Sequence, residues 1–506
     1  MKRRTSTTGE RQIPMNSNQG SYDDLIQIAL DGLRELQEKS PEELRQWVSR
    51  QPVLPSTVPV GRDGSVLITS EGYSALKKLG RTWHANDATR LRLLSRTASE
   101  ELAVYAFGDL LDAAGDLPAD ADAKSELLRG MDKRLQARTQ PEHFYFPARV
   151  FDQPEVQTFA IGPVSFYRRV EWLDAVETLA GAPCSWKAEV LDRWANRQSR
   201  LRHILNSLGE WFTGKLLKHW PGSSLARNLL RLRTHRSYVD DIVKAVGACE
   251  WVMAVAVEGR ERSRSSECAF AAGLVALDSL GLPMPASAAR NLRGPGHERG
   301  PQLQHDLHQR AGRPLSFSIS LDLPRLGGPP GAQAGLLSNM TTLRDAVGRA
   351  LTAFVNAADT GNAPLLFRRW VEAMYWFGQA RREQNEFIAL VKLGIALDIL
   401  AKGGKAKGIL ALTRAIFGKS DNDVIASDSR TLKEVVETLY NDGRSKIAHG
   451  GTLALLCELP IELGIADSLT AHVLAGYVVY ATQYVGMDTY EDFLAALPAI
   501  RAAAPT

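Results

Sequence analysis

The sequence predicts a predominantly helical α+β protein, in which a mixed region over residues 21–335 precedes an antiparallel helical bundle over residues 336–506. Three observations predict this class. Apolar residues recur at helical spacing almost throughout the chain from Thr342 onward. Aromatic and β-branched residues alternate over Phe144–Tyr167, a pattern typical of strands. A stretch rich in glycine and proline, Asn291–Gly335, follows, and we place the main domain boundary after it.

The first part of the mixed region is expected to be mainly helical. Helices are predicted over Ser21–Trp47, Ser70–Leu79 and Leu91–Asp112, with a short strand over Val66–Ile68. Prolines at positions 52, 55 and 59 end the first helix. The residue pattern changes near position 140, which allows two subdomains to meet there.

The second part of the mixed region combines strands and helices. Strands are predicted within Phe144–Tyr167 and over Glu250–Val257, with helices over Glu171–Ala180 and Cys268–Leu280. One further strand, Leu315–Leu323, is expected between two flexible loops. In the bundle, Arg430–Asn441 carries apolar residues at helical spacing, and Asp442-Gly443 is interpreted as a helix stop.

Composition indicates an ordinary globular protein. Of 506 residues, 44% are hydrophobic and 23% are charged, and the net charge of +4 is too small to indicate a nucleic-acid-binding protein by itself. The four cysteines include no C-x-x-C pair, so we expect neither a zinc site nor a disulfide framework. We expect no metal and no cofactor.

The sequence also suggests where the protein resides. Residues 1–20 are polar and lack the apolar segment of a signal peptide, so we expect a disordered tail. No run approaches the roughly 18–20 apolar residues that a membrane span needs. These two observations predict a cytoplasmic protein that makes no contact with a membrane.

One stretch of the mixed region is strongly basic. Between Arg193 and Arg236 there are ten basic residues and one acidic residue, Glu210, with Trp194, Trp211, Phe212 and Trp220 interleaved. Such a face can attract a polyanion while aromatic rings stack on bases. The alternative is that the aromatic residues belong to a core and the arginines to a solvated or partner-binding helix face. The candidate RNA contacts are Arg193, Arg197, Arg200, Arg227, Arg231 and Arg233.

The candidate catalytic residues are Arg444 and His449, which follow the predicted helix Arg430–Asn441. A guanidinium binds phosphate oxygens through paired hydrogen bonds, and a histidine can transfer protons near neutral pH. The spacing itself is common, since five Arg–His pairs with four to six intervening residues occur in the chain. The setting distinguishes this pair, because it follows an amphipathic helix and precedes Gly450-Gly451, where the backbone can approach a ligand.

This segment, LYNDGRSKIAHGG, resembles the RSxxxHG form of the Arg-x4–6-His motif of HEPN domains, in particular the Apea-like HEPN group of bacterial defence and abortive-infection proteins. The resemblance extends over Leu365–Gly486 and includes Glu386–Leu400, which is similar to a long helix of that group. Asn441, Ser445 and Gly450 are the supporting motif residues, and Lys446 is a further candidate RNA contact.

The chemistry of the pair and the resemblance together predict a metal-independent endoribonuclease. His449 would act as general base or acid on the 2′-OH or on the leaving 5′-oxygen, and Arg444 would stabilise the charge that builds on phosphorus. The products implied are a 2′,3′-cyclic phosphate and a 5′-hydroxyl. The resemblance implies the toxin or effector of an anti-phage defence system, with residues 21–335 sensing a trigger or restraining the nuclease, and a possible antitoxin.

Helix geometry leaves two possibilities for the pair. On a regular α-helix, five residues turn through about 500°, which leaves Arg444 and His449 about 140° apart, so either the motif lies at a helix start or two copies face each other. The resemblance implies a composite site made by two copies, so we expect a homodimer through the C-terminal bundle. The alternative function is a non-catalytic HEPN-like module that binds RNA or a protein. In a purely structural interpretation, Arg444 caps a helix and His449 is a satisfied buried histidine.

Two other patterns are weaker. His297, His305 and His308 have spacings that a metal site can use, but no carboxylate or cysteine cluster accompanies them. The run from Gly403 to Gly408, GGKAKG, lacks the order of a phosphate-binding P-loop. We interpret it as a solvated loop between bundle helices, whose lysines can touch an RNA backbone.

Overall fold

The structure is a computed structural model that describes residues 21–503 except 62–63, 115–119, 182–183, 196–237, 248, 295–301, 309–315, 323–325, 358–362, 427, 447–458 and 460. The chain divides into two compact units. Unit 1 comprises Met1–Glu142 and Glu258–Glu267, and unit 2 comprises His143–Val257 and Cys268–Thr506. The predicted class, α+β and predominantly helical, is confirmed.

The units differ from the predicted domains. The division after Glu142 lies close to the predicted subdomain change near 140, whereas no division follows residue 335. A single hydrophobic core of unit 2 contains residues from Ala148 to Leu497, so the strands of the middle region share their core with the C-terminal helices. The boundary predicted after residue 335 is therefore not a boundary between compact units.

Unit 1 is mainly helical, as predicted. The predicted strand lies in β2, which pairs with β1 in an antiparallel hairpin. The helix predicted over Ser21–Trp47 is two helices, because Ser40 caps a new one through a capping box with Glu43. Its elements are α1 (Tyr22–Gln37), α2 (Pro41–Arg50), β1 (Ser56–Val60), β2 (Gly64–Ile68), α3 (Ser70–Ala85), α4 (Ala88–Leu93), α5 (Arg96–Ala114) and α6 (Asp120–Arg138).

The helix predicted over Leu91–Asp112 is also divided. The chain leaves helical geometry at Leu94, between α4 and α5, and the Leu94 carbonyl oxygen lies 3.0 Å from His84 Nε2 and 3.1 Å from Arg264 Nε. The contact with Arg264 comes from a residue that is distant in the sequence, so helical periodicity alone does not reveal the break.

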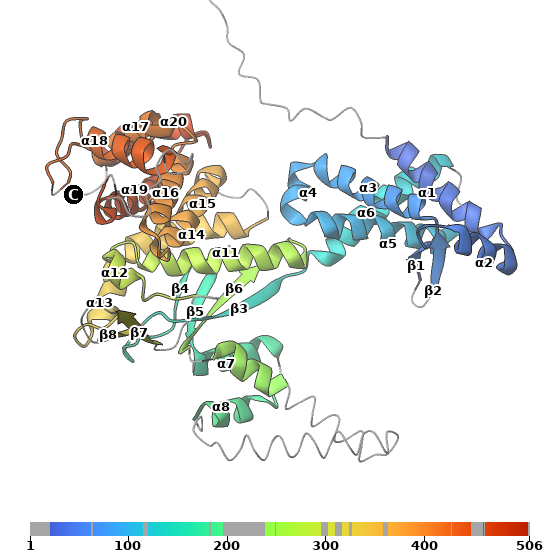
Figure 1. Ribbon diagram of the computed structural model, residues 1–506, viewed down its shortest axis with the longest axis horizontal. Coiled ribbons are helices and arrows are strands. Elements are labelled where there is room, and N and C mark those ends of the chain that lie inside the picture. Colours follow the sequence, from blue (N-terminus) through green and yellow to red (C-terminus); the bar gives the residue numbers. More distant parts are fainter. Residues whose placement is uncertain are drawn as a thin grey trace, which may run out of the picture. The chain divides into compact units, whose positions relative to one another are not determined.

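Unit 2 begins with a four-stranded sheet of order β3-β6-β5-β4, in which β5 pairs antiparallel with both β4 and β6. The predicted strands are present, and α11 covers the sheet, as Figure 1 shows. A Cβ placed on Gly273 of α11 would lie 3.6 Å from side chains of both β3 and β6. The elements are β3 (Glu142–Ala148), β4 (Phe159–Ile161), β5 (Val164–Arg168), α7 (Arg169–Ala180), α8 (Lys187–Ala195), β6 (Trp251–Val257), α11 (Arg262–Leu280) and α12 (Ala286–Ala289).

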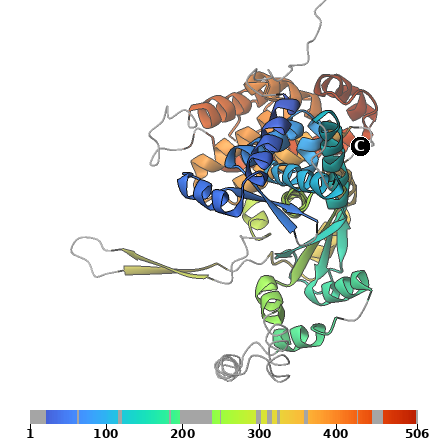
Figure 2. The ribbon, with the colours of Figure 1, turned by 90° about the vertical axis from the view of Figure 1, so that its right-hand side faces the viewer.

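The Gly/Pro-rich stretch contains one more strand than predicted. Leu315–Leu323 does contain a strand, β8 (Ser316–Asp322), and it pairs antiparallel with β7 (Gln302–His308). Figure 2 shows the two strands side by side as a hairpin. The polar sequence of β7 resembles a loop, and its pairing with β8 makes it a strand. His305 and His308 therefore lie on a strand, and not on the helix that the metal-site spacing would need.

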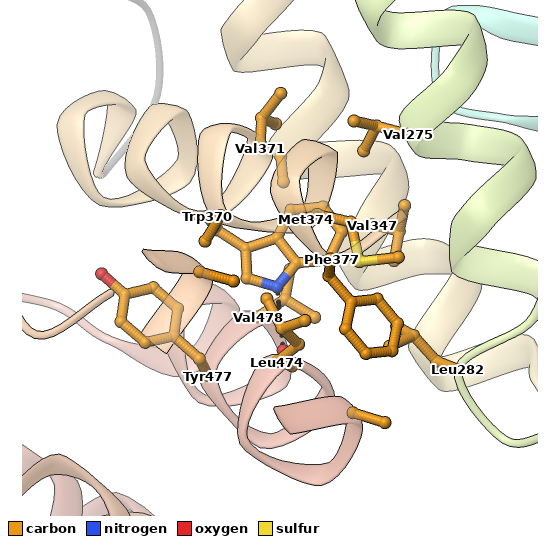
Figure 3. Packing of buried hydrophobic residues seen from close by; sticks show 14 of the residues in the cluster. Val275, Leu282, Val347, Trp370, Val371, Met374, Phe377, Leu474, Tyr477 and Val478 are labelled. Atoms are coloured by element: carbon orange, nitrogen blue, oxygen red, sulfur yellow. Dashed lines mark hydrogen bonds between the residues drawn. The ribbon is translucent and has the colours of Figure 1, made fainter. Parts of the chain in front are cut away.

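The remaining elements of unit 2 are helices, as predicted from Thr342 onward. Figure 3 shows how α15 and α19 pack, with Trp370 between the two helices. Trp370 is fully buried, and its indole N–H donates to the Leu474 carbonyl at 2.8 Å. The helices are α13 (Ala332–Asn339), α14 (Thr341–Val355), α15 (Pro364–Arg381), α16 (Glu386–Leu400), α17 (Lys405–Phe417), α18 (Leu432–Glu437), the π-helix η1 (Thr438–Lys446), α19 (Leu463–Gln483) and α20 (Tyr490–Ala503).

Among the described residues, α19 is long and apolar enough to cross a membrane by length and composition. This differs from the expectation that no such run exists. Half of its most apolar window is buried inside the protein, and Leu474, Tyr477 and Val478 belong to the core of unit 2. Its apolar character is explained by the residues that pack within the bundle, whereas Ser468 and His472 are exposed.

Candidate active site around Arg444

Arg444 lies inside a helix and not after one. The predicted stop at Asp442-Gly443 is wrong, because the chain continues through both residues as the nine-residue π-helix η1. A Cβ at Gly443 would lie 2.8 Å from Leu390 Cδ2 on α16, so the glycine permits close packing of the two helices. π-helices are rare and often occur at functional sites, and a run of this length is unusual.

Contacts with α16 and with η1 itself determine where Arg444 lies. Its Cβ is close to Gly394, where an added Cβ would lie only 2.6 Å away. Arg444 Nη1 donates a hydrogen bond to the Tyr440 hydroxyl at 2.9 Å, and the guanidinium carbon lies 5.1 Å from the centre of that ring. Arg444 Nη2 lies 3.4 Å from Asp398 Oδ2, and the arginine side chain remains 30% exposed.

Asp398 connects Arg444 to the neighbouring loop. Its carboxylate is 13% exposed, and Oδ1 accepts a hydrogen bond from the backbone N–H of Lys405 at 2.9 Å. Its backbone carbonyl also accepts from Gly403 N–H at 2.8 Å. Lys402 and Lys405 both have positive φ values, of 56° and 55°, a conformation that costs energy for non-glycine residues. The acidic side chain thus holds a strained basic loop beside the arginine.

Three lysines follow Asp398, and they differ in their partners. Lys402 lies in the turn after α16, whereas Lys405 and Lys407 lie in the first turn of α17, so the interpretation of Gly403–Gly408 as a loop is wrong from Lys405 onward. The Lys402 ammonium pairs with Glu491 at 2.6 Å. Lys405 and Lys407 are exposed, and neither ammonium has a hydrogen bond or an ion pair with any residue that the structure describes. The Arg444 guanidinium is therefore half-buried against the Asp398 carboxylate, and the start of α17, which also contacts Asp398, carries two exposed lysines without partners among the described residues.

Tyr440 is the other member of this site. Burial raises the pKa of its hydroxyl, and the nearby Asp398 carboxylate raises it further, while Arg444 opposes both effects. The phenol therefore stays neutral near neutral pH, and its oxygen accepts the hydrogen bond of Arg444.

Sequence reasoning did not select Asp398 or Tyr440. One signal was present for Asp398, because only three charged residues, Glu386, Lys392 and Asp398, interrupt the apolar sequence of α16. Tyr440 precedes Arg444 by four residues, a separation at which side chains on a helix meet. Neither observation identified the three-residue contact, since that depends on how η1 packs against α16.

The other residues of the predicted motif are only partly described. Asn441 is exposed, Ser445 is half-buried, and Lys446 ends η1. His449 and Gly450 lie outside the described residues. Of the expected Arg444–His449 pair, the structure therefore describes only the arginine.

Of the basic stretch between Arg193 and Arg236, the structure describes only the first few residues. Arg193 pairs with both Glu189 and Asp240, and its side chain is 18% exposed. Trp194 is buried in a small core with Trp172 and Val190. Trp194 matches the structural alternative, in which the aromatic residues belong to a core, whereas Arg193 is paired and mostly buried and does not lie on a solvated face. Arg197, Arg200, Arg227, Arg231 and Arg233 lie outside the described residues.

Comparison with protein-family models, with curated proteins and with solved structures gave no match for this chain.

Proposed function

We propose that the chain is a metal-independent endoribonuclease of the HEPN type, the effector of an anti-phage defence system. Arg444 is the phosphate-binding residue, and His449 is the proton-transfer residue. The observation that carries the proposal is the environment of Arg444. Its guanidinium is partly exposed and is oriented by Asp398 and Tyr440, and Asp398 also contacts the start of α17, which carries two lysines without partners among the described residues.

The reaction uses a nucleophile from the substrate. The 2′-oxygen attacks phosphorus as its proton passes to a base, and the bond from phosphorus to the 5′-oxygen breaks as that oxygen takes up a proton. The products are a 2′,3′-cyclic phosphate and a 5′-hydroxyl. His449 performs one of the two proton transfers. Arg444 stabilises the negative charge that develops on the non-bridging oxygens.

The second proton-transfer group comes from a second copy in this proposal. A two-fold axis brings two Arg444–His449 pairs to one substrate, so each His449 supplies one of the two transfers. The protein then acts as a homodimer through its C-terminal helices, which form a HEPN-like bundle. Unit 1 and the sheet of unit 2 would carry the sensing or restraining role.

One observation favours a second function, a non-catalytic module that binds RNA or a protein. The Asp398 carboxylate lies 3.4 Å from Arg444 Nη2, where it competes with a phosphate for the guanidinium. In this alternative, Arg444 mainly joins η1 to α16, and Lys405 and Lys407 bind a polyanion without cleaving it.

The two functions are distinguished by expressing wild type, His449→Ala and Arg444→Lys, and analysing total RNA for cleavage and for 2′,3′-cyclic phosphate ends. In Arg444→Lys the charge is kept but the paired hydrogen bonds are lost, and in His449→Ala the proton-transfer group is lost. We therefore expect both variants to lose cleavage. Folding is checked by circular dichroism and thermal unfolding. Intact RNA with the wild type, including during phage challenge, would favour the binding module.

A further inference from the structure

A cavity of about 630 Å³ lies in unit 2, away from the site around Arg444, between the β4–β5 turn and three helices of the bundle. Its walls come from that turn, from α14, from Phe367 of α15 and from the end of α19. The volume is within the range of small-molecule sites, roughly 300–1,000 Å³. The lining residues are Ala160, Gly162, Arg344, Asp345, Gly348, Arg349, Thr352, Ala353, Phe367, Ala481 and Thr482.

Two glycines bring the walls of the cavity together. Gly162, in the β4–β5 turn, has a φ of +57°, and a Cβ there would lie 2.3 Å from the carbonyl oxygen of Gly348 on α14. A Cβ at Gly348 would in turn lie 2.8 Å from the Gly162 nitrogen. The two backbones are thus in direct contact, which positions the turn against the helix and forms one side of the cavity.

The cavity has an apolar floor and a polar rim. Ala353, Phe367 and Ala481 are buried members of the unit 2 core. Thr352 and Thr482 lie among the polar lining residues, and each hydroxyl donates to a backbone carbonyl of its own helix. Their oxygens keep lone pairs that can accept hydrogen bonds from a ligand. This combination suits a molecule with a flat apolar part and several polar groups.

The rim is positively charged. Arg344 is half-buried. It donates to the Leu337 carbonyl at 3.3 Å and to the Ala160 carbonyl at 3.4 Å, while its Nε is itself buried and has no partner among the described residues. Arg349 is exposed and makes no hydrogen bond or ion pair with any described residue. Asp345 is the one carboxylate of the lining, and no ion pair joins it to Arg349. Two guanidinium groups against one carboxylate favour an anion.

We propose that this cavity binds a mononucleotide, with the phosphate at Arg349 and Arg344 and the base over the apolar floor beside Phe367. A planar guanidinium recognises a phosphate through paired hydrogen bonds, and the Arg349 guanidinium has no ion pair with any described residue. The proposal does not depend on the nuclease activity, because none of the lining residues belongs to the site around Arg444.

The test measures binding to the full chain by isothermal titration calorimetry, with thermal unfolding alongside. The probes are adenosine and guanosine monophosphates, the corresponding nucleosides, and inorganic phosphate. We expect a monophosphate to bind and to raise the unfolding temperature, and we expect the nucleoside and inorganic phosphate each to bind at least about tenfold more weakly. Phosphate binding as tightly as the nucleotides would overturn the role of the apolar floor.

Three variants locate the site. Arg349→Glu reverses the charge at the rim and should weaken binding by about tenfold or more. Thr352→Trp places a large side chain at an exposed position of the lining and should abolish binding while the chain stays folded. Arg45→Glu is the matched control, an exposed arginine on α2 of unit 1, and should bind as the wild type does. Failure of every probe to bind, or equal binding by all variants, would overturn the proposal.

Discussion

The Arg444 guanidinium and the Asp398 carboxylate lie 3.4 Å apart, and the same carboxylate accepts a hydrogen bond from the Lys405 backbone N–H. One acidic side chain of α16 therefore orients the candidate phosphate-binding arginine and determines the shape of the neighbouring basic loop. Oδ2 contacts Arg444 and Oδ1 accepts from Lys405, so a mutation can remove one interaction and keep the other.

Asp398→Asn should change activity more than stability. An asparagine oxygen can still accept from the Lys405 N–H, but the attraction to Arg444 is lost, so the arginine is less well oriented and freer to bind phosphate. We expect slower RNA cleavage, and tighter RNA binding when measured in a His449→Ala background. Asp398→Ala, which removes both interactions, should also lower the free energy of unfolding by about 1 kcal/mol. Unchanged cleavage by Asp398→Asn would argue against an orienting role.

Gly394→Ala should displace η1 from α16. The new Cβ would lie 2.6 Å from Arg444 Cβ, so the helices must separate, at a cost of about 1–3 kcal/mol. Urea unfolding measures the loss, and RNA cleavage should fall with it. Gly335→Ala in α13 is the control, because nothing lies within 4 Å of its added Cβ, and it should stabilise the protein by about 0.5–1 kcal/mol.

Lys405 and Lys407 should contribute to RNA affinity through charge alone. The double variant Lys405→Gln/Lys407→Gln, compared within a His449→Ala background, should bind single-stranded RNA more weakly and with a shallower dependence on salt. The dependence of log affinity on log salt should fall by about 0.7 for each phosphate contact that is lost. Lys402→Gln is the matched control, since that ammonium already pairs with Glu491. If replacing Lys402 weakened RNA binding as much as replacing Lys405 or Lys407, the result would indicate only a general electrostatic attraction between the protein and RNA.

The buried ion pair between Arg381 and Asp467 should matter far more for stability than an exposed pair. Arg381 donates from Nε and Nη2 to the two carboxylate oxygens at 2.8 Å each, and both side chains are below 10% exposure. Asp467→Asn leaves a buried guanidinium without its counter-charge and should cost about 3–5 kcal/mol of unfolding free energy. Glu491→Gln, which breaks the exposed Lys402 pair, should cost less than about 1 kcal/mol. Chemical denaturation of both variants tests the contrast.

Tyr490 should make the protein less stable at alkaline pH. Burial raises the pKa of its hydroxyl to about 12, above the ordinary value of 10.0 that it regains on unfolding. The folded state therefore favours the neutral phenol, and this contribution is complete below pH 10 and lost as pH rises towards 12. Between pH 8 and pH 11 we expect a fall of about 1.4 kcal/mol in the free energy of unfolding from this residue.

Tyr490→Phe should remove that part of the pH dependence, as measured by urea unfolding at the two pH values. The Tyr490 hydroxyl has no hydrogen-bond partner among the described residues, so the variant should be no less stable than wild type at pH 8. A wild-type slope that persists in the variant would assign the effect to other groups, with the deeply buried Tyr477 the first to test, since burial raises the pKa of its hydroxyl as well.

The sequence pattern of a single helix or strand predicted the fold well where the spacing of its apolar residues was enough to identify the element. The apolar run Glu250–Val257 is a strand, β6, at the centre of the sheet, and the apolar residues of α15 and α16 face a common core. The polar strand β7 was missed because its sequence carries no alternation, and its partner β8 makes it a strand. The predicted break after residue 335 failed for a related reason, since the core of unit 2 joins segments on both sides of it.

By itself, the sequence determined the class of the protein, the positions of most helices and strands, and Arg444 as a residue worth testing, because periodicity and residue chemistry are local properties. Only the tertiary structure decided that the helix continues past Gly443, since that glycine packs against Leu390 of α16. It also decided that Arg444, Tyr440, Asp398 and Lys405 form one site. Contacts between residues distant in the chain depend on how helices pack, and no local pattern encodes them.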